Sequence, residues 1–319
     1  MKKIVHFIIK NKDLSRLKPF WALSRTPHGL LDMTTPAFAA LVCLGHFPSF
    51  RQALLGIITA FAGYTAVYAL NDLVDYPCDQ ERLKQDVFAQ RNAALDIDAA
   101  LVRHPLAQGL ISFREGLLWT LFWAVIAVSG AWMLNPVCIL FFIAGCLLES
   151  LYCLLFRVSP LRTLVNGVVK TLGPLAAVYA LKPDPSLLYL LTLFFMLFFW
   201  EIGGQNIPND CGDMEEDIRL KARTFPLVFG TDLSAFAVLS TLSGAFILSL
   251  ILLHLSPADF TFPFYLILAA GGVILLIFPA QRFYQNRENS EAMMLFNKAS
   301  YFPPLIFLLV WARIIFPAG

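Results

Sequence analysis

Charged residues are scarce in this sequence. Only 14% of the 319 residues are Asp, Glu, Lys or Arg, and 58% are hydrophobic, whereas a typical soluble domain carries about 25% charged residues. A chain of this composition cannot cover itself with a water-facing surface, which excludes an ordinary soluble domain. The net charge of +2 provides no strongly basic surface, which argues against nucleic acid as the main partner.

Cysteine motifs and a secretion signal are also lacking. None of the six cysteines stands in a CxxC pair, so neither a zinc site nor a disulfide framework is expected. The N-terminal sequence is basic and carries charges every few residues, without the unbroken apolar region and cleavage site of a signal peptide. We therefore expect residues 1–28 to form an amphipathic segment on the cytoplasmic face of a membrane.

Long apolar runs, by contrast, fill most of the chain. A helix that crosses the hydrocarbon core needs about 20 mostly apolar residues, and nine stretches reach this length. They are residues 30–48, 53–71, 115–134, 137–156, 163–181, 186–206, 232–254, 263–281 and 300–317. We predict an all-α, polytopic membrane protein that is one domain over residues 1–319, with about nine transmembrane helices around a central cavity.

The basic residues are distributed unevenly between the two sets of connecting segments. Twenty of the 24 Lys and Arg residues lie on one side, and Arg51, Lys182 and Arg313 lie on the other. Those twenty are in the N-terminal segment and in the segments near 72–114, 157–162, 207–231 and 282–299. Because Lys and Arg favour cytoplasmic segments, we expect the N-terminus and the long loops in the cytoplasm. Our working expectation for the membrane is the bacterial inner membrane.

One acidic motif occurs twice. The chain reads NDLVDYPCD from Asn71 to Asp79, after the second apolar stretch, and NDCGDMEED from Asn209 to Asp217, after the sixth. Both copies match N-D-x-x-D-x-x-x-D and stand 138 residues apart. Acidic residues that only solvate a loop are the simpler interpretation of either copy alone, but chance does not readily explain the matched pair. The repeat predicts two related halves that face one cavity.

The spacing of the motif has a chemical meaning. On a helix, positions i, i+4 and i+8 share one face, which aligns Asn71, Asp75 and Asp79, and likewise the equivalent residues of the second copy. Carboxylates on one face repel each other unless a cation lies between them, and such oxygen ligands suit Mg²⁺ bound together with substrate phosphates. Two facing clusters would hold a diphosphate through magnesium. Pro77, inside the first copy, is expected to disturb the helix before Asp79.

At these motifs the chain resembles the UbiA-type intramembrane prenyltransferase superfamily. That family has the motif NDxxDxxxD after the second of its nine transmembrane helices, and the matching segment here is NDLVDYPCD at 71–79. It has the motif DxxxD after the sixth helix, and the matching segment here is DMEED at 213–217. DIRLKARTFPLVFG at 217–230 is similar to the family's continuation, and RHPLAQG at 103–109 is similar to its RPLxxG segment. Here His104 stands where the family often has arginine. The segment 80–102 is longer than usual in the family and would cover the site or alter the choice of acceptor.

The resemblance implies a reaction and the residues that perform it. The family transfers an isoprenoid chain from its diphosphate to an acceptor, commonly an aromatic ring, so the expected partners are a prenyl diphosphate, a lipophilic acceptor and membrane lipid. The implied Mg²⁺ ligands are Asn71, Asp72, Asp75, Asp79, Asp213 and Asp217. Four of them, Asp72, Asp75, Asp213 and Asp217, are the implied catalytic residues. The implied substrate contacts are Asn71, Arg103, Asn209, Lys221 and Arg223.

Ionisable residues inside apolar stretches commonly mark a cavity. Lys170 lies about two turns into the fifth stretch, and we interpret it as a substrate contact, with a lysine that reaches the interface or pairs with a glutamate as an equal alternative. Glu149 and Glu201 lie nearer the ends of their stretches and are expected at the interface. Three tyrosines near the cytoplasmic side would either shield an allylic carbocation or pack against lipid: Tyr64, Tyr68 and Tyr152.

Two other functions stay open at this point. The same metal site would serve the transfer of a phosphoribosyl-type group to a polyprenyl phosphate, and the motifs do not distinguish these donors. Many spans and a repeat also fit a transporter, although a carrier places its polar site near the bilayer midplane and the charges here gather at one face. We predict a magnesium-dependent prenyltransferase as the leading interpretation.

Overall fold

The computed structural model describes residues 16–84 and 101–316, and all regular secondary structure within them is helical. The predicted N-terminal amphipathic segment and the segment 80–102 lie partly outside the described residues. Within the described residues, eight continuous helical stretches are long and apolar enough to cross a membrane. They are α4 (Phe50–Lys84), α5 (Phe113–Leu134), α6 (Val137–Leu154), α7 (Arg162–Leu181), Leu187–Gly212, α11 (Phe225–His254), Phe262–Asn286 and Asn289–Ile315. The prediction of an all-α polytopic membrane protein is confirmed.

Several stretches are composed of shorter elements. The stretch Leu187–Gly212 consists of α8 (Leu187–Trp200), the π-helix η2 (Glu201–Asn206) and α9 (Ile207–Gly212), and α10 (Met214–Arg219) follows it. The stretch Phe262–Asn286 consists of α12 (Phe262–Gly272), the π-helix η3 (Val273–Ile277) and α13 (Phe278–Asn286), and the last stretch consists of α14 (Asn289–Ala299) and α15 (Phe302–Ile315). Before α4 the chain forms two shorter helices, α2 (Thr26–Asp32) and α3 (Thr34–Leu44). Both π-helical segments end two residues before a proline, Pro208 or Pro279. Proline has no N–H to donate to the carbonyl four residues earlier. That carbonyl lies inside the π-helical segment in both cases, so the regular α-helical hydrogen bonds are interrupted there.

The first predicted span, 30–48, is divided between α2 and α3. Pro36 has no N–H to donate to the carbonyl of Asp32, and the hydroxyl of Thr35 donates to that oxygen instead, at 2.8 Å. The side chain of Asp32 is buried at the junction of the two helices. The break between the two helices thus lies next to a buried acidic side chain within a predicted apolar span.

Helix α4 carries the whole first acidic motif. The helix continues through Pro77 to Lys84, so the expected disturbance before Asp79 is wrong at the level of secondary structure. The helix has 35 residues, and at about 1.5 Å per residue it is about 52 Å long, well beyond the roughly 30 Å of a hydrocarbon core. Its last turns therefore extend past the apolar layer with the motif on them.

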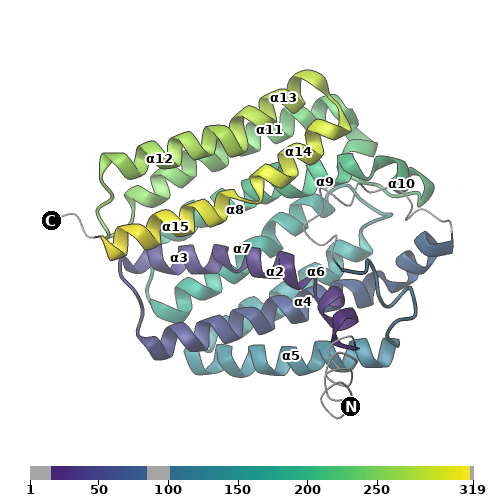
Figure 1. The fold of residues 1–319 in the computed structure, drawn as a ribbon, viewed down its shortest axis with the longest axis horizontal. Helices are drawn as coiled ribbons and strands as arrows, with labels where there is room; N and C mark the ends of the chain where they lie inside the picture. Colours follow the sequence, from purple (N-terminus) through teal and green to yellow (C-terminus); the bar gives the residue numbers. More distant parts are fainter. Residues whose placement is uncertain (1–15, 85–100, 317–319) are drawn as a thin grey trace, which may run out of the picture.

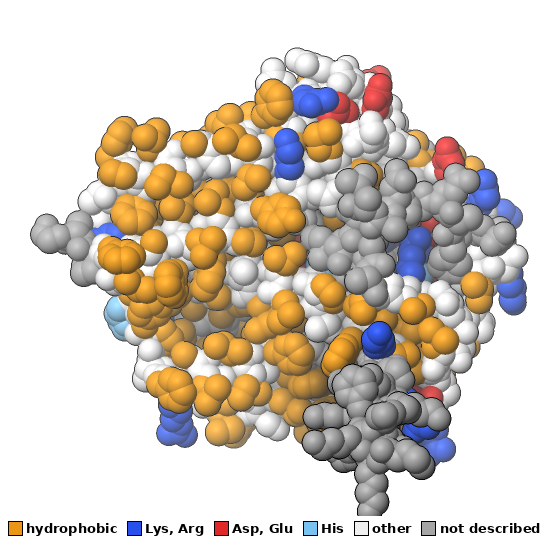
Figure 2. Space-filling model, in the orientation of Figure 1, with side chains coloured by type: hydrophobic (Ala, Val, Ile, Leu, Met, Phe, Trp, Pro, Cys, Tyr) orange, Lys and Arg blue, Asp and Glu red, His pale blue; other side chains and the backbone are white. Residues whose placement is uncertain are grey.

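The helices run roughly along the long axis of the molecule, with α4 and α5 at one edge and α11, α12 and α13 at the other (Figure 1). The end of α4 and α10 lie at one end of the bundle, and α15 terminates at the opposite end. Figure 2 shows that hydrophobic side chains cover most of this face and that charged side chains gather toward the end with α10. Large apolar side chains such as Leu118, Val125 and Leu140 are exposed. This is the surface expected of a protein surrounded by lipid.

Two hydrophobic clusters hold the helices together. The larger one includes buried residues of α8, α11 and α15, among them Leu197, Leu242 and Ile306. The smaller one joins Leu73 of α4 to Leu106, which lies in the RHPLAQG segment. Because Leu106 is buried against α4, the segment that precedes α5 is fixed beside the first motif.

A central cavity of about 780 Å³ lies among α2, α3, α4, α6, α7 and η2. Most of its wall is apolar, and one asparagine from each motif, Asn71 and Asn209, also lines it. The face in Figure 2 is hollowed between α3 and α4, and residues of both helices line the cavity. The predicted central cavity is thus present, and it reaches the acidic motifs.

Gly167 is expected to be required for the packing of α7 against α8. A Cβ atom at this position would lie 2.7 Å from the ring of Phe198, so Gly167→Ala must displace that ring and should destabilise the protein by about 1–3 kcal/mol. Gly56 is the matched control, since a Cβ there meets nothing within 4 Å, and Ala within a helix gains about 0.5–1 kcal/mol over Gly. Thermal unfolding in detergent measures both, and equal melting temperatures would contradict the packing argument.

Candidate active site

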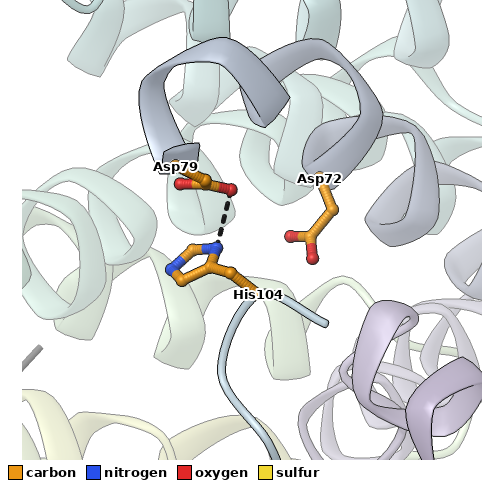
Figure 3. A group of neighbouring side chains, drawn as sticks. All are labelled: Asp72, Asp79 and His104. Atoms are coloured by element: carbon orange, nitrogen blue, oxygen red, sulfur yellow. Dashed lines mark ion pairs between the residues drawn. The ribbon is translucent and has the colours of Figure 1, made fainter. Parts of the chain in front are cut away.

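The first motif forms a buried acidic surface on α4. Asp72 and Asp79 are 3% and 2% exposed, and they lie on the same face because they are two helical turns apart. His104, from the segment before α5, points toward Asp79 (Figure 3), with Nδ1 2.7 Å from Oδ2 of Asp79. Each of the three residues offers a ligand atom within 4.8 Å of the others. The structure thus assembles a group of possible metal ligands here.

The remaining motif residues of α4 have different surroundings. The Nδ2 of Asn71 donates to Oε1 of Glu149 at 2.5 Å and to Sγ of Cys153 at 3.3 Å, so its amide is held against α6. Asp75 is partly buried one turn further along α4. The structure therefore groups Asp72 and Asp79 with His104, whereas the spacing argument aligned Asn71, Asp75 and Asp79.

The second motif lies at the junction of α9 and α10. Asp213 occupies the turn between these helices and accepts a hydrogen bond from Nδ2 of Asn209 at 3.3 Å. Asp217 on α10 is 2% exposed, and Asp210 on α9 is 4% exposed. The buried Oδ2 of Asp210 receives no hydrogen bond from the described residues. This second group therefore contains one carboxylate oxygen, on Asp210, that is buried and receives no hydrogen bond from the described residues.

Arginine side chains connect the two motifs. Arg82, one turn beyond the first motif, lies 2.9 Å from Oδ1 of Asp79 through Nη1 and 3.0 Å from Oε1 of Glu216 through Nε. Arg103 lies 3.5 Å from the same oxygen of Glu216. The predicted approach of the two acidic segments is thus observed as a chain of ion pairs across the bundle.

The electrostatics of the described residues fit a bound cation. Burial, together with the nearby charges of Asp210 and Asp213, raises the pKa of Asp217 to about 7. Burial lowers the pKa of His104 to about 4, so its ring is neutral at pH 7, the form that binds metals. A divalent cation would offset the repulsion among the carboxylates. The donors are mainly carboxylate oxygens, which is the chemistry of a Mg²⁺ site.

Two predicted diphosphate contacts lie at the surface. Lys221 and Arg223 both have exposed side chains after α10. The backbone N–H of Arg223 donates to the carbonyl of Phe156 at 2.8 Å, which attaches this segment to the end of α6. Their contact with a diphosphate stays a prediction.

Lys170 faces the cavity and is paired with acidic groups. Its Nζ lies 2.6 Å from Oδ2 of Asp32 and 3.8 Å from Oε2 of Glu201. Glu149 and Glu201 are 7% and 4% exposed and line the cavity. Both carboxylates are thus buried inside the bundle, and the expectation that they lie at the depth of the membrane interface stays a prediction.

Several residues of this region were missed by the sequence analysis. Asp32 lies inside a predicted span, so the rule that drew attention to Lys170 would also have found it. Arg82 lies three residues after Asp79, on the motif's face of the helix. Arg162 is 7% exposed, with its guanidinium carbon 4.1 Å from the ring centroid of Tyr152, and no local pattern indicated its burial.

Comparisons with known proteins agree with this architecture. Residues 33–302 match the model of the UbiA prenyltransferase family. The 4-hydroxybenzoate octaprenyltransferase of Tolumonas auensis is 25% identical over 294 residues, which are 91% of this chain and 94% of that protein. A digeranylgeranylglyceryl phosphate synthase of Thermococcus kodakarensis is 22% identical over 219 residues, which are 69% of this chain and 72% of that one.

The fold is also found in a solved structure. A UbiA homologue from Archaeoglobus fulgidus, bound to GPP and Mg²⁺, superposes with a TM-score of 0.66 at 16% identity, and the match covers 93% of this chain and 100% of the homologue. The paired acidic motifs, the helical architecture and the family match over most of the sequence agree with one another. The chain belongs to the UbiA prenyltransferase family.

Proposed function

We propose that this protein transfers an isoprenoid chain from a prenyl diphosphate to a lipophilic acceptor within the membrane, in a reaction that depends on Mg²⁺. The observation that carries the proposal is the bridge made by Arg82 between Asp79 and Glu216, which joins two motifs whose asparagines line an apolar cavity of about 780 Å³. A diphosphate held between the motifs would leave its apolar chain in that cavity. Family membership favours prenyl transfer over phosphoribosyl-type transfer and over transport.

The motif carboxylates would hold the metal ions and, through them, the diphosphate. These ligands are Asp72, Asp75, Asp79, Asp213 and Asp217, with the amide of Asn71. When bound, Mg²⁺ would offset the negative charge that develops on the diphosphate as its bond to the prenyl chain breaks. A GPP- and Mg²⁺-bound homologue with this fold supports the assignment.

Basic and aromatic side chains would complete the site. Arg103, Lys221 and Arg223 are proposed to donate charge-assisted hydrogen bonds to diphosphate oxygens. The tyrosines Tyr64, Tyr68 and Tyr152 line the cavity, and their ring faces would stabilise positive charge on the allylic carbon. Asn209 would orient Asp213, to which it donates a hydrogen bond.

We also propose that the motif end of the bundle faces the cytoplasm. Twenty of the 24 Lys and Arg residues lie in the segments assigned to that side, and such segments are usually cytoplasmic. Substrates would then reach the site from the cytoplasm or from the surrounding lipid.

The proposed function is tested by incubating the purified protein with labelled geranylgeranyl or longer prenyl diphosphates and a panel of aromatic and lipid acceptors. A prenylated product is expected with Mg²⁺, and loss of product is expected with a chelator and in Asp75→Ala and Asp213→Ala. Absence of both product and diphosphate release with every prenyl donor would overturn the proposal, and phosphorylated sugar donors would be tested next.

A further inference from the structure

A buried polar cluster interrupts the apolar wall of the cavity, and we call it the Asp32–Lys170–Glu201 cluster after its charged members. Lys170 Nζ lies 2.6 Å from Asp32 and 3.8 Å from Glu201. The hydroxyl of Tyr68 donates to Oδ2 of Asp32, and Nδ2 of Asn166 donates to Oε1 of Glu201 at 2.8 Å. All five residues line the cavity. The cluster therefore presents polar groups to the interior of the cavity.

The position of the cluster suits an acceptor rather than the diphosphate. Tyr68 precedes Asp72 by four residues on α4, so the cluster lies about one helical turn, roughly 6 Å, deeper in the bundle than the first motif. A diphosphate at the motif would place the first carbon of its prenyl chain on the side of the cavity that faces the cluster. A polar group held by the cluster would then lie beside the carbon that reacts.

The hydrogen-bonding capacity of the cluster selects the ligand's chemistry. Oε2 of Glu201 and Oδ1 of Asn206 are buried and accept no hydrogen bond from the described residues. Glu201 and Asn206 are five residues apart, and in an α-helix their side chains would point about 140° away from each other. They lie in η2, whose π-helical i→i+5 hydrogen bonds bring both side chains to one face of the helix. Both residues line the cavity. These two oxygens can therefore accept hydrogen bonds from a ligand that carries an O–H or N–H group.

The charge of the cluster disfavours an anionic ligand. Asp32 and Glu201 carry two carboxylates against one ammonium, and that ammonium is held closest to Asp32. Two further side chains that line the cavity already lie near acidic groups: Arg25 is 3.7 Å from Asp72, and His28 is 3.9 Å from Asp32. A ligand carboxylate or phosphate would meet uncompensated negative charge here.

We propose, on the basis of the proposed function, that this cluster is the acceptor site, that it takes an uncharged acceptor with a donating O–H group, and that Glu201 receives its proton. The acceptor oxygen bonds to the first carbon of the prenyl chain. The bond from that carbon to the diphosphate breaks, and its electron pair leaves with the diphosphate. The O–H proton passes to Oε2 of Glu201, so that atoms and charge balance.

The test uses matched pairs of acceptors that differ in one charge. Methyl 4-hydroxybenzoate is compared with 4-hydroxybenzoate, and a long-chain glycerol ether with its phosphate, each with geranylgeranyl diphosphate and Mg²⁺. The uncharged member of at least one pair is expected to show a kcat/KM at least about 10-fold higher than its anionic partner. Methyl 4-methoxybenzoate, which has no O–H, is expected to give no product.

Variants test the role of Glu201 separately from folding. Glu201→Gln is expected to lower kcat about 10²-fold for the uncharged acceptor and to reduce the preference over its anionic partner. The KM of the prenyl diphosphate and the binding of magnesium pyrophosphate are expected to be unchanged. Glu288→Gln, at an exposed glutamate, is the matched control and should behave as the unmodified protein.

The outcomes distinguish the two proposals. Preference for the anionic members, or an unchanged preference in Glu201→Gln, would overturn the acceptor assignment while the proposed function stands. Release of diphosphate without prenylation of any uncharged acceptor would also count against it. Absence of both product and diphosphate release would instead overturn the proposed function.

Discussion

Replacement of Asp72 by asparagine is expected to slow prenyl transfer by at least about 10²-fold, the usual effect of removing a group that stabilises transition-state charge. Asn keeps the shape of the side chain but removes a carboxylate that lies beside Asp79 and His104. Asp72 is buried, with 3% of its surface exposed, and loss of its charge relieves repulsion among the neighbouring buried carboxylates. The protein should therefore fold normally. Single-turnover transfer from labelled prenyl diphosphate, measured across Mg²⁺ concentrations, gives the rate.

The control for this substitution is Asp184→Asn. Asp184 is exposed in the connection between α7 and α8, so its loss should leave both the rate and the Mg²⁺ dependence unchanged. A normal rate for Asp72→Asn at every Mg²⁺ concentration would contradict the assignment of the first motif to metal and diphosphate binding.

Replacement of Arg82 by methionine is expected to cost about 3–5 kcal/mol of stability, because it removes the arginine that lies closest to two buried carboxylates. Arg82 is 14% exposed at its side chain, and its partners Asp79 and Glu216 are 2% and 12% exposed. Transfer should also be strongly reduced, since Arg82 sets the distance between the two motifs. Thermal unfolding in detergent measures the stability, and the transfer assay measures the activity.

An exposed ion pair provides the comparison. Arg157 lies 2.6 Å from Glu81, but both side chains are more than 40% exposed, so Arg157→Met should cost only about 0.2–1 kcal/mol. In Arg82→Met, the further substitution Glu216→Gln should recover part of the loss, because it removes a charge that has lost its closer arginine. Equal stability of Arg82→Met and Arg157→Met would contradict the prediction that the ion-pair bridge of Arg82 stabilises the fold.

The membrane architecture could be predicted from local sequence properties. Apolar runs of about 20 residues satisfy the length of a bilayer, and no distant contact is needed to recognise them. The two acidic motifs could be found for the same reason, because their spacing of four places carboxylates on one helical face. Pro77 was the exception. Local helix rules predict a disturbance there, but the observed helix α4 accommodates it.

The partners of the site residues depended on the tertiary structure. Arg82 meets Glu216 across 134 positions of sequence and Lys170 meets Asp32 across 138, and no local pattern specifies such pairs. The π-helical register of η2 was likewise not predicted from the sequence, and it decides that Glu201 and Asn206 share a face of the cavity.

The sequence by itself determined that this chain crosses a membrane repeatedly, that it carries two acidic motifs and that it resembles one enzyme family. The tertiary structure decided which carboxylates lie together, which are neutralised by arginine or lysine, and which line the cavity. The physical reason is that hydropathy and helical periodicity act within a few turns of one helix. Ion pairing and burial depend on how helices distant in sequence are rotated and packed against one another.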